Sequence, residues 1–140
     1  MSDIFVDTSG WAELIDPSLK HHTLAAKIYR QARQQHRQLI TSNYIITELV
    51  ALLTSPLRIP RKQTIEFINS LKNSPSVEIV HINATLDTQT WQLLIQREDK
   101  NWSLVDCSSF MIMRQRHLME ALTTDHHFEQ AGFIRLLKSE

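Results

Sequence analysis

Four acidic residues occupy positions from which they could bind one metal ion: Asp7, Glu48, Asp106 and Asp125. Carboxylates that share a site repel one another and raise one another's pKa unless a cation neutralises them. Oxygen ligands without cysteine or clustered histidine favour Mg²⁺ or Mn²⁺ over Zn²⁺. Such a cation polarises a phosphate oxygen, orients a water for in-line attack and stabilises the leaving oxygen. The pattern therefore indicates metal-assisted phosphate chemistry.

Glu48 gives the strongest single indication of a cation. Four residues at helical spacing form an apolar surface around it: Tyr44, Ile45, Ala51 and Leu52. We therefore predict that Glu48 is buried, and an unpaired buried carboxylate costs several kcal/mol. No lysine or arginine occurs between Arg37 and Arg58 to pair with it. A metal ion is the simplest partner.

Short apolar runs alternate with helical patterns along the 140 residues, and these elements must position the acids. Strands are predicted over 4–6, 38–41, 77–82, 119–124 and 133–137. Helices are predicted over 11–15, 19–38, 44–54, 60–72, 84–97 and from Ser103 onward. The chain has only two glycines, which leaves few hairpin turns. We therefore expect an α/β fold with a mainly parallel sheet, in a single domain spanning 1–140.

The four acids fall near one edge of such a sheet, where the strands have their carboxyl ends. Ligand sites of open parallel sheets lie beyond that edge. Each acid also has a structural alternative. Asp7 can cap a helix, and Asp106 can complement a helix dipole. Asp125 can be a turn residue, and Glu48 can point outward; taken together, the four favour a shared site.

Three hydroxyl residues adjoin the acids: Thr8, Ser9 and Ser103. Thr8 or Ser9 can donate to a metal-bound water or to a phosphate, and either can instead cap the first helix. Ser103 is expected to cap the helix that carries Asp106 three residues later, as in a capping box with Asp in place of Glu. These residues are predicted to support the acids.

Composition limits the class of protein. Fifteen basic and fifteen acidic residues give no net charge, and ordinary apolar content excludes a disordered or collagen-like chain. A single cysteine gives no sign of an oxidising compartment. The amino-terminal residues MSDIFVD lack the features of a signal peptide, and no stretch is apolar enough to span a bilayer. We expect a cytoplasmic protein without a membrane partner.

Several segments, in the same order, resemble the PIN-domain ribonucleases, a family that includes the VapC-type toxins of bacterial toxin–antitoxin pairs. They are Asp7-Thr8-Ser9 after an apolar strand, Glu48 in a helix, SLVDCSSF at 103–110 and TDHHFEQAGF at 124–133. The resemblance covers essentially the whole chain. It implies a five-stranded parallel sheet with helices on both faces.

The resemblance also implies an activity. It places the metal ligands at Asp7, Glu48, Asp106 and Asp125 and implies an endoribonuclease that depends on Mg²⁺ or Mn²⁺. It further implies an RNA substrate, a cognate antitoxin protein and a homodimer. Asn101 stands where relatives often carry another acid, so we expect four acidic ligands.

An RNA-binding surface is predicted on the basic part of the chain. Residues 17–77 hold nine basic and two acidic side chains. Arg30, Arg33 and Arg37 follow helical spacing and can track an RNA backbone, although a solvated helix face has the same pattern. Trp11 and Trp102 adjoin the acidic segments and either pack in the core or stack on a base.

Three other function classes fit parts of the pattern. A PIN nuclease that processes RNA outside a toxin pair would carry the same acids. A receiver-like phosphoacceptor module also gathers acids around Mg²⁺, but it needs a lysine beyond a late strand, and Lys138 comes very late. A phosphatase with Asp7 as its nucleophile needs a second acid two residues on, where this chain has Ser9.

Overall fold

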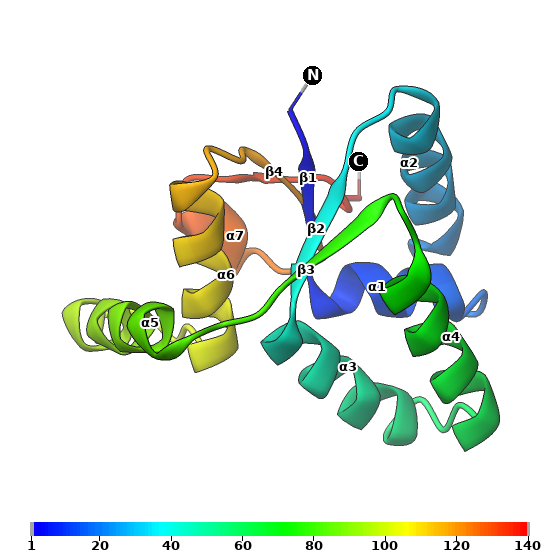
Figure 1. The fold of residues 1–140 in the computed structure, drawn as a ribbon, viewed down its shortest axis with the longest axis horizontal. Coiled ribbons are helices and arrows are strands. Elements are labelled where there is room, and N and C mark those ends of the chain that lie inside the picture. Colours follow the sequence, from blue (N-terminus) through cyan, green and yellow to red (C-terminus); the bar gives the residue numbers. More distant parts are fainter. Residues whose placement is uncertain (1, 140) are drawn as a thin grey trace.

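The computed structural model describes residues 2–139, and within them five strands form one sheet (Figure 1). The strands are β1 (Ile4–Val6), β2 (Leu39–Ser42), β3 (Val77–Val80), β4 (Glu120–Leu122) and β5 (Ile134–Arg135). Their spatial order is β3-β2-β1-β4-β5, and every neighbouring pair is parallel. Phe5 of the central strand pairs with Ile40 on one side and Ala121 on the other. The prediction of a five-stranded parallel sheet is confirmed.

Helices cover both faces of this sheet, as expected. They are α1 (Thr8–Ile15), α2 (His22–Gln34), α3 (Asn43–Thr54), α4 (Arg61–Asn73), α5 (Ala84–Gln96), α6 (Leu104–Gln115) and α7 (His127–Gln130). Helices α1, α2 and α4 lie on one side and α6 and α7 on the other, with α5 outside α6 (Figure 1). Helix α3 continues from β2 and contacts α1 and α4. None of the helices within residues 2–139 is long and apolar enough to cross a membrane.

Helix α1 begins directly after Asp7, earlier than the sequence pattern predicts. Gly10 therefore lies inside the helix and not in a turn before it. A Cβ atom at Gly10 would lie 2.2 Å from the carbonyl oxygen of Leu122, so only glycine lets α1 contact the backbone at the end of β4. This contact brings Asp7 beside the loop that follows β4.

Helix α2 is shorter than the predicted 19–38 because His36 adopts the left-handed backbone conformation, with φ of 56°. Arg37 therefore leaves the helix and is buried. Its Nε donates to the carbonyl oxygen of Ser2 at 2.6 Å, and its Nη2 pairs with Glu120. The prediction that Arg37 binds RNA is wrong, because its guanidinium joins the amino ends of β1 and β4, at the sheet edge opposite the acids.

A cluster of aromatic rings fixes α6 and α7 on the sheet. Phe110 of α6 lies edge-on to Trp102 and Phe128, with ring centroids 4.9 and 5.0 Å away. Phe128 of α7 in turn contacts Phe5 of β1 at 6.3 Å. Trp11 and Trp102 are both buried, so the packing interpretation is confirmed and base stacking is wrong for both.

Candidate active site

The four predicted acids surround one open pocket of about 410 Å³ at the carboxyl edge of the sheet. Its lining is polar and comes from four parts of the chain: Asp7, Thr8, Ser9, Glu48, Leu52, Asp106, Thr124, Asp125 and His126. No lysine or arginine of the described residues belongs to this lining. The fold thus brings four carboxylates together without the permanent positive charge of a lysine or arginine to neutralise them.

Asp7 is the most deeply placed of the acids. It is 5% exposed, and Thr123 Oγ1 donates to its Oδ2 at 2.9 Å. The pKa of Asp7 is raised from 3.8 to about 7, mainly by burial and to a smaller extent by the charges of Asp106 and Glu48, against the effect of the hydrogen bonds it accepts. Asp7 stands at the N-cap position of α1, yet its side chain makes no capping hydrogen bond. Its carboxylate is therefore available to the pocket.

Glu48 lies on the pocket wall, although the reason given for it from the sequence was wrong. The buried stripe of α3 runs through Ile45, Leu49 and Leu53, which leaves Glu48 exposed at the flank of that stripe. Because the Glu48 carboxylate is not buried, burial gives no reason to expect a cation beside it. Thr8 Oγ1 donates to Glu48 Oε1 at 2.6 Å, which holds the carboxylate over the start of α1.

Asp106 is buried in the first turn of α6 and forms the predicted capping box. Its backbone nitrogen donates to Ser103 Oγ at 3.0 Å, and Ser103 nitrogen donates to Asp106 Oδ2 at 3.1 Å. The same Oδ2 lies 3.0 Å from His127 Nδ1. The helix-capping alternative is thus correct for Asp106 and uses one carboxylate oxygen. Oδ1 has no hydrogen-bond partner within residues 2–139.

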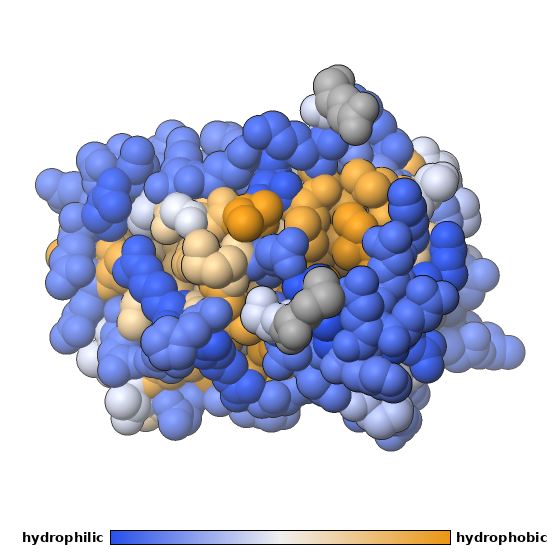
Figure 2. Space-filling view, turned by 90° about the horizontal axis from the view of Figure 1, so that it is seen from above, coloured by the Kyte–Doolittle hydropathy of each residue, from blue (hydrophilic) through white to orange (hydrophobic). Residues whose placement is uncertain are grey.

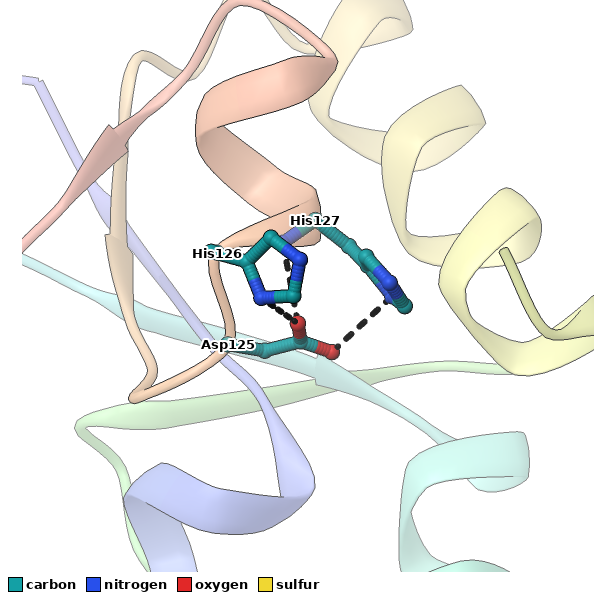
Figure 3. Close-up of side chains that lie close together, drawn as sticks. All are labelled: Asp125, His126 and His127. Atoms are coloured by element: carbon teal, nitrogen blue, oxygen red, sulfur yellow. Dashed lines mark hydrogen bonds and ion pairs between the residues drawn. The ribbon is translucent and has the colours of Figure 1, made fainter. Parts of the chain in front are cut away.

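Asp125 follows β4 in a tight turn that leads into α7. Its Oδ1 accepts from the backbone nitrogen of His127 at 2.9 Å, as the turn alternative predicts. The side chains of His126 and His127 stand on either side of the Asp125 carboxylate (Figure 3), with Nδ1 atoms 3.7 and 3.4 Å from its oxygens. Two imidazoles therefore adjoin the acids.

Thr123 is the residue at this site that sequence reasoning missed. Besides donating to Asp7, its Oγ1 accepts from the backbone nitrogen of Asp125 at 3.0 Å. Ser9 Oγ lies 3.2 Å from the same hydroxyl and accepts from Thr124 nitrogen at 3.0 Å. Ser9 therefore joins α1 to the loop after β4 and does not cap α1. The only sequence signal that could have indicated it is a hydroxyl residue that directly follows the apolar strand residues Ala121 and Leu122.

The chain matches a known protein family along most of its length. The sequence profile of the PIN domain matches residues 4–134. The chain belongs to the PIN domain family. Two curated relatives, the "23S rRNA-specific endonuclease VapC20" of Mycobacterium tuberculosis strains CDC 1551 / Oshkosh and ATCC 25618 / H37Rv, are each 29% identical over 133 residues, covering 95% of this chain and 97% of theirs. The crystal structure of M. tuberculosis VapC20, a "Sarcin-Ricin loop cleaving toxin", superimposes with a TM-score of 0.82 at 28% identity, over 94% of this chain and 97% of that one.

The carboxylate oxygens of this PIN domain fit a hard divalent cation as ligands. Hydrogen bonds within residues 2–139 use Glu48 Oε1 and Asp106 Oδ2, which leaves Glu48 Oε2 and Asp106 Oδ1 without donors. Burial, with a smaller contribution from the charges of Asp106 and Glu48, raises the pKa of Asp7, and a cation beside it would favour the ionised form. Oxygen ligands and uncompensated negative charge are the conditions that Mg²⁺ and Mn²⁺ meet in proteins.

Proposed function

We propose that this PIN domain is a Mg²⁺- or Mn²⁺-dependent endoribonuclease and the toxin of a toxin–antitoxin pair. The observation that carries the proposal is the convergence of Asp7, Glu48, Asp106 and Asp125 on one pocket that no lysine or arginine of residues 2–139 lines. The match to VapC20 over nearly the full length of both chains supports the toxin assignment.

The four acids would hold the divalent cation. When bound, the cation supplies polarisation of the scissile phosphate and activation of a water for in-line attack. The chain's own residues keep the acids in place. Thr8 orients the carboxylate of Glu48, and Thr123 orients that of Asp7 while also fixing the backbone at Asp125. Such supporting hydrogen bonds typically change metal affinity or activity by about 10–100-fold.

A ribosomal RNA loop is the first substrate to test, because the relatives are named for 23S rRNA and the sarcin–ricin loop. A chain with this target would work in the cytoplasm, where ribosomes are, and would need a cognate antitoxin to prevent self-damage. We also propose that it forms a homodimer. Size-exclusion chromatography with light scattering tests the dimer, and a small DNA-binding protein encoded immediately upstream would identify the antitoxin.

The receiver-like alternative receives no support from the geometry. It needs a lysine that can reach a phosphoryl group on Asp7. Lys138 Nζ instead pairs with Glu129 Oε2 at 2.8 Å, outside the pocket lining. The RNA-processing alternative shares the same acids and is separated from the toxin by experiment alone.

The decisive experiment is cleavage of 23S rRNA, and of a hairpin carrying its sarcin–ricin loop, by the purified chain. We expect cleavage with Mg²⁺ or Mn²⁺ and none in excess EDTA. Asp7→Asn should reduce cleavage about 100-fold or more, whereas Glu66→Gln, which alters an exposed acid on α4, should cleave like the wild type. Equal cleavage by the Asp7→Asn and wild-type proteins would contradict the proposal. Growth arrest on expression of the wild type but not of Asp7→Asn identifies a toxin, and cleavage without arrest identifies a processing enzyme.

A further inference from the structure

Asp125, His126 and His127 form a cluster of mixed ligands at the edge of the acidic pocket. One ligand atom from each of the three residues lies within 4.8 Å of the other two. Figure 3 shows both imidazole rings beside the same carboxylate. The four-acid site accounts for Asp125 but gives neither histidine a role.

The spacing within this cluster suits a small tetrahedral ion. Two ligands on one tetrahedral zinc ion lie about 3.3 Å apart, since each bond is about 2.0–2.1 Å long. The two imidazole Nδ1 atoms lie 3.4 and 3.7 Å from oxygens of Asp125. The two nitrogens face different oxygens of Asp125, Oδ1 for His126 and Oδ2 for His127, and a turn of the exposed His126 ring would bring both to a common ion.

Most of the cluster is already held in place by the fold. The Asp125 carboxylate is fixed by the backbone nitrogen of His127 at 2.9 Å, and the Asp125 backbone by Thr123. The His127 ring lies against Asp106, whose Oδ2 is 3.0 Å from the same Nδ1 that faces Asp125. The His126 side chain is 65% exposed and can turn towards its neighbours. Binding an ion therefore requires the ordering of the His126 side chain and the exchange of one contact of His127 Nδ1, from Asp106 Oδ2 to the ion.

We propose that Asp125, His126 and His127 form a second cation site, selective for a nitrogen-preferring transition ion such as Zn²⁺ or Co²⁺. Two imidazoles and one carboxylate leave a fourth tetrahedral position open towards the pocket. Ligand nitrogen favours these ions over Mg²⁺, which prefers oxygen and keeps its waters. The site shares Asp125 with the four-acid site but requires neither Glu48 nor Asp7. It does not depend on the proposed RNA cleavage.

Co²⁺ is the probe for this site, because its visible absorption reports on its ligands and Zn²⁺ can displace it. We expect the purified chain to bind Co²⁺ with one intense visible spectrum that Zn²⁺ abolishes and excess Mg²⁺ does not. His126→Ala and His127→Ala should each weaken Co²⁺ binding at least about tenfold and reduce the spectrum. Two matched controls should retain it: His81→Ala, an exposed histidine after β3, and Glu48→Gln, an acid of the other site.

The outcomes separate this site from the proposed nuclease centre. Thermal melts in EDTA verify that each variant folds. His126→Ala should fold like the wild type, because it alters an exposed ring. Unchanged Co²⁺ binding in both histidine variants would overturn the proposal. So would a loss of Co²⁺ binding in Glu48→Gln alone, or an affinity of the wild-type protein for Co²⁺ that is no greater than its affinity for Mg²⁺. Mg²⁺-dependent RNA cleavage is measured separately. Its loss in Glu48→Gln, together with a retained Co²⁺ spectrum, shows two distinct sites.

Discussion

A buried hydrogen bond of 2.9 Å joins Thr123, at the end of β4, to the carboxylate of Asp7, at the end of β1. The same hydroxyl oxygen accepts from the backbone nitrogen of Asp125. Thr123 is fully buried, so no water competes for these bonds. A single side chain thus sets the position of two acids that are far apart in the sequence.

Thr123→Val keeps the shape of this side chain and removes its hydroxyl. We expect a loss of about 1–3 kcal/mol in the free energy of unfolding, because a buried carboxylate and a buried N–H lose their partner. Mn²⁺ affinity should fall about 10–100-fold. Urea unfolding in EDTA and Mn²⁺ titration measure the two effects. Thr88→Val, at an exposed position on α5, is the control and should change stability by less than about 0.5 kcal/mol. Equal behaviour of the two variants would remove Thr123 from the site.

The raised pKa of Asp7 predicts how the metal-free protein responds to pH. The unfolded carboxyl loses its proton near 3.8 and the folded one near 7, so between these values the folded state holds a proton that the unfolded state lacks. Stability should therefore fall as the pH rises through this range, by up to about 4 kcal/mol. Asp7→Asn should abolish this part of the fall. Urea unfolding of both proteins in EDTA at pH 5 and pH 8 gives the difference, and parallel pH profiles would show that Asp7 ionises normally.

Glu48→Gln is expected to separate function from folding. Glu48 is exposed, and glutamine can still accept the hydrogen bond from Thr8. The free energy of unfolding in EDTA should change by less than about 0.5 kcal/mol. Mn²⁺ affinity and RNA cleavage should both fall at least about tenfold. Thermal melts, isothermal titration and a cleavage assay test this, and retained Mn²⁺ affinity would exclude Glu48 from the ligands.

Changes to the three arginines should have different effects. Arg37→Ala should lower the free energy of unfolding by about 1–3 kcal/mol, because it breaks a buried ion pair with Glu120.

Arg30 and Arg33 are exposed on α2, and the prediction that they bind RNA stays a prediction. Replacing both by alanine should weaken RNA binding and flatten its dependence on salt, because fewer counterions are released. Filter binding at several salt concentrations measures the slope, and an unchanged slope would leave α2 as a solvated face.

The sequence was most informative where structure depends on local spacing. The alternation of strands and helices, and the capping box of Ser103 and Asp106, follow from residues near one another in the chain. Glu48 was predicted as buried because its neighbours are apolar, but the packing of α3 against α1 and α4 decides which face is covered. Arg37 continues the spacing of Arg30 and Arg33, yet the helix stops before it.

Contacts across the sheet were beyond local patterns. The partnership of Thr123 with Asp7 depends on the register of β1 and β4, in which Val6 pairs with Leu122. That register comes from packing of the whole sheet. The positions of His126 and His127 around Asp125 likewise depend on the turn into α7, which the aromatic cluster of Phe110 and Phe128 fixes.

The contact between Gly10 and Leu122 has a consequence for synthesis of the chain on the ribosome. Asp7 and Glu48 emerge early, but β1 gains its second neighbour only when β4 follows, several seconds later at about 5–20 residues per second. Asp106 and Asp125 also emerge late. A growing chain therefore lacks the complete pocket until most of its residues have been translated, so the four acids cannot act together while the chain is being made.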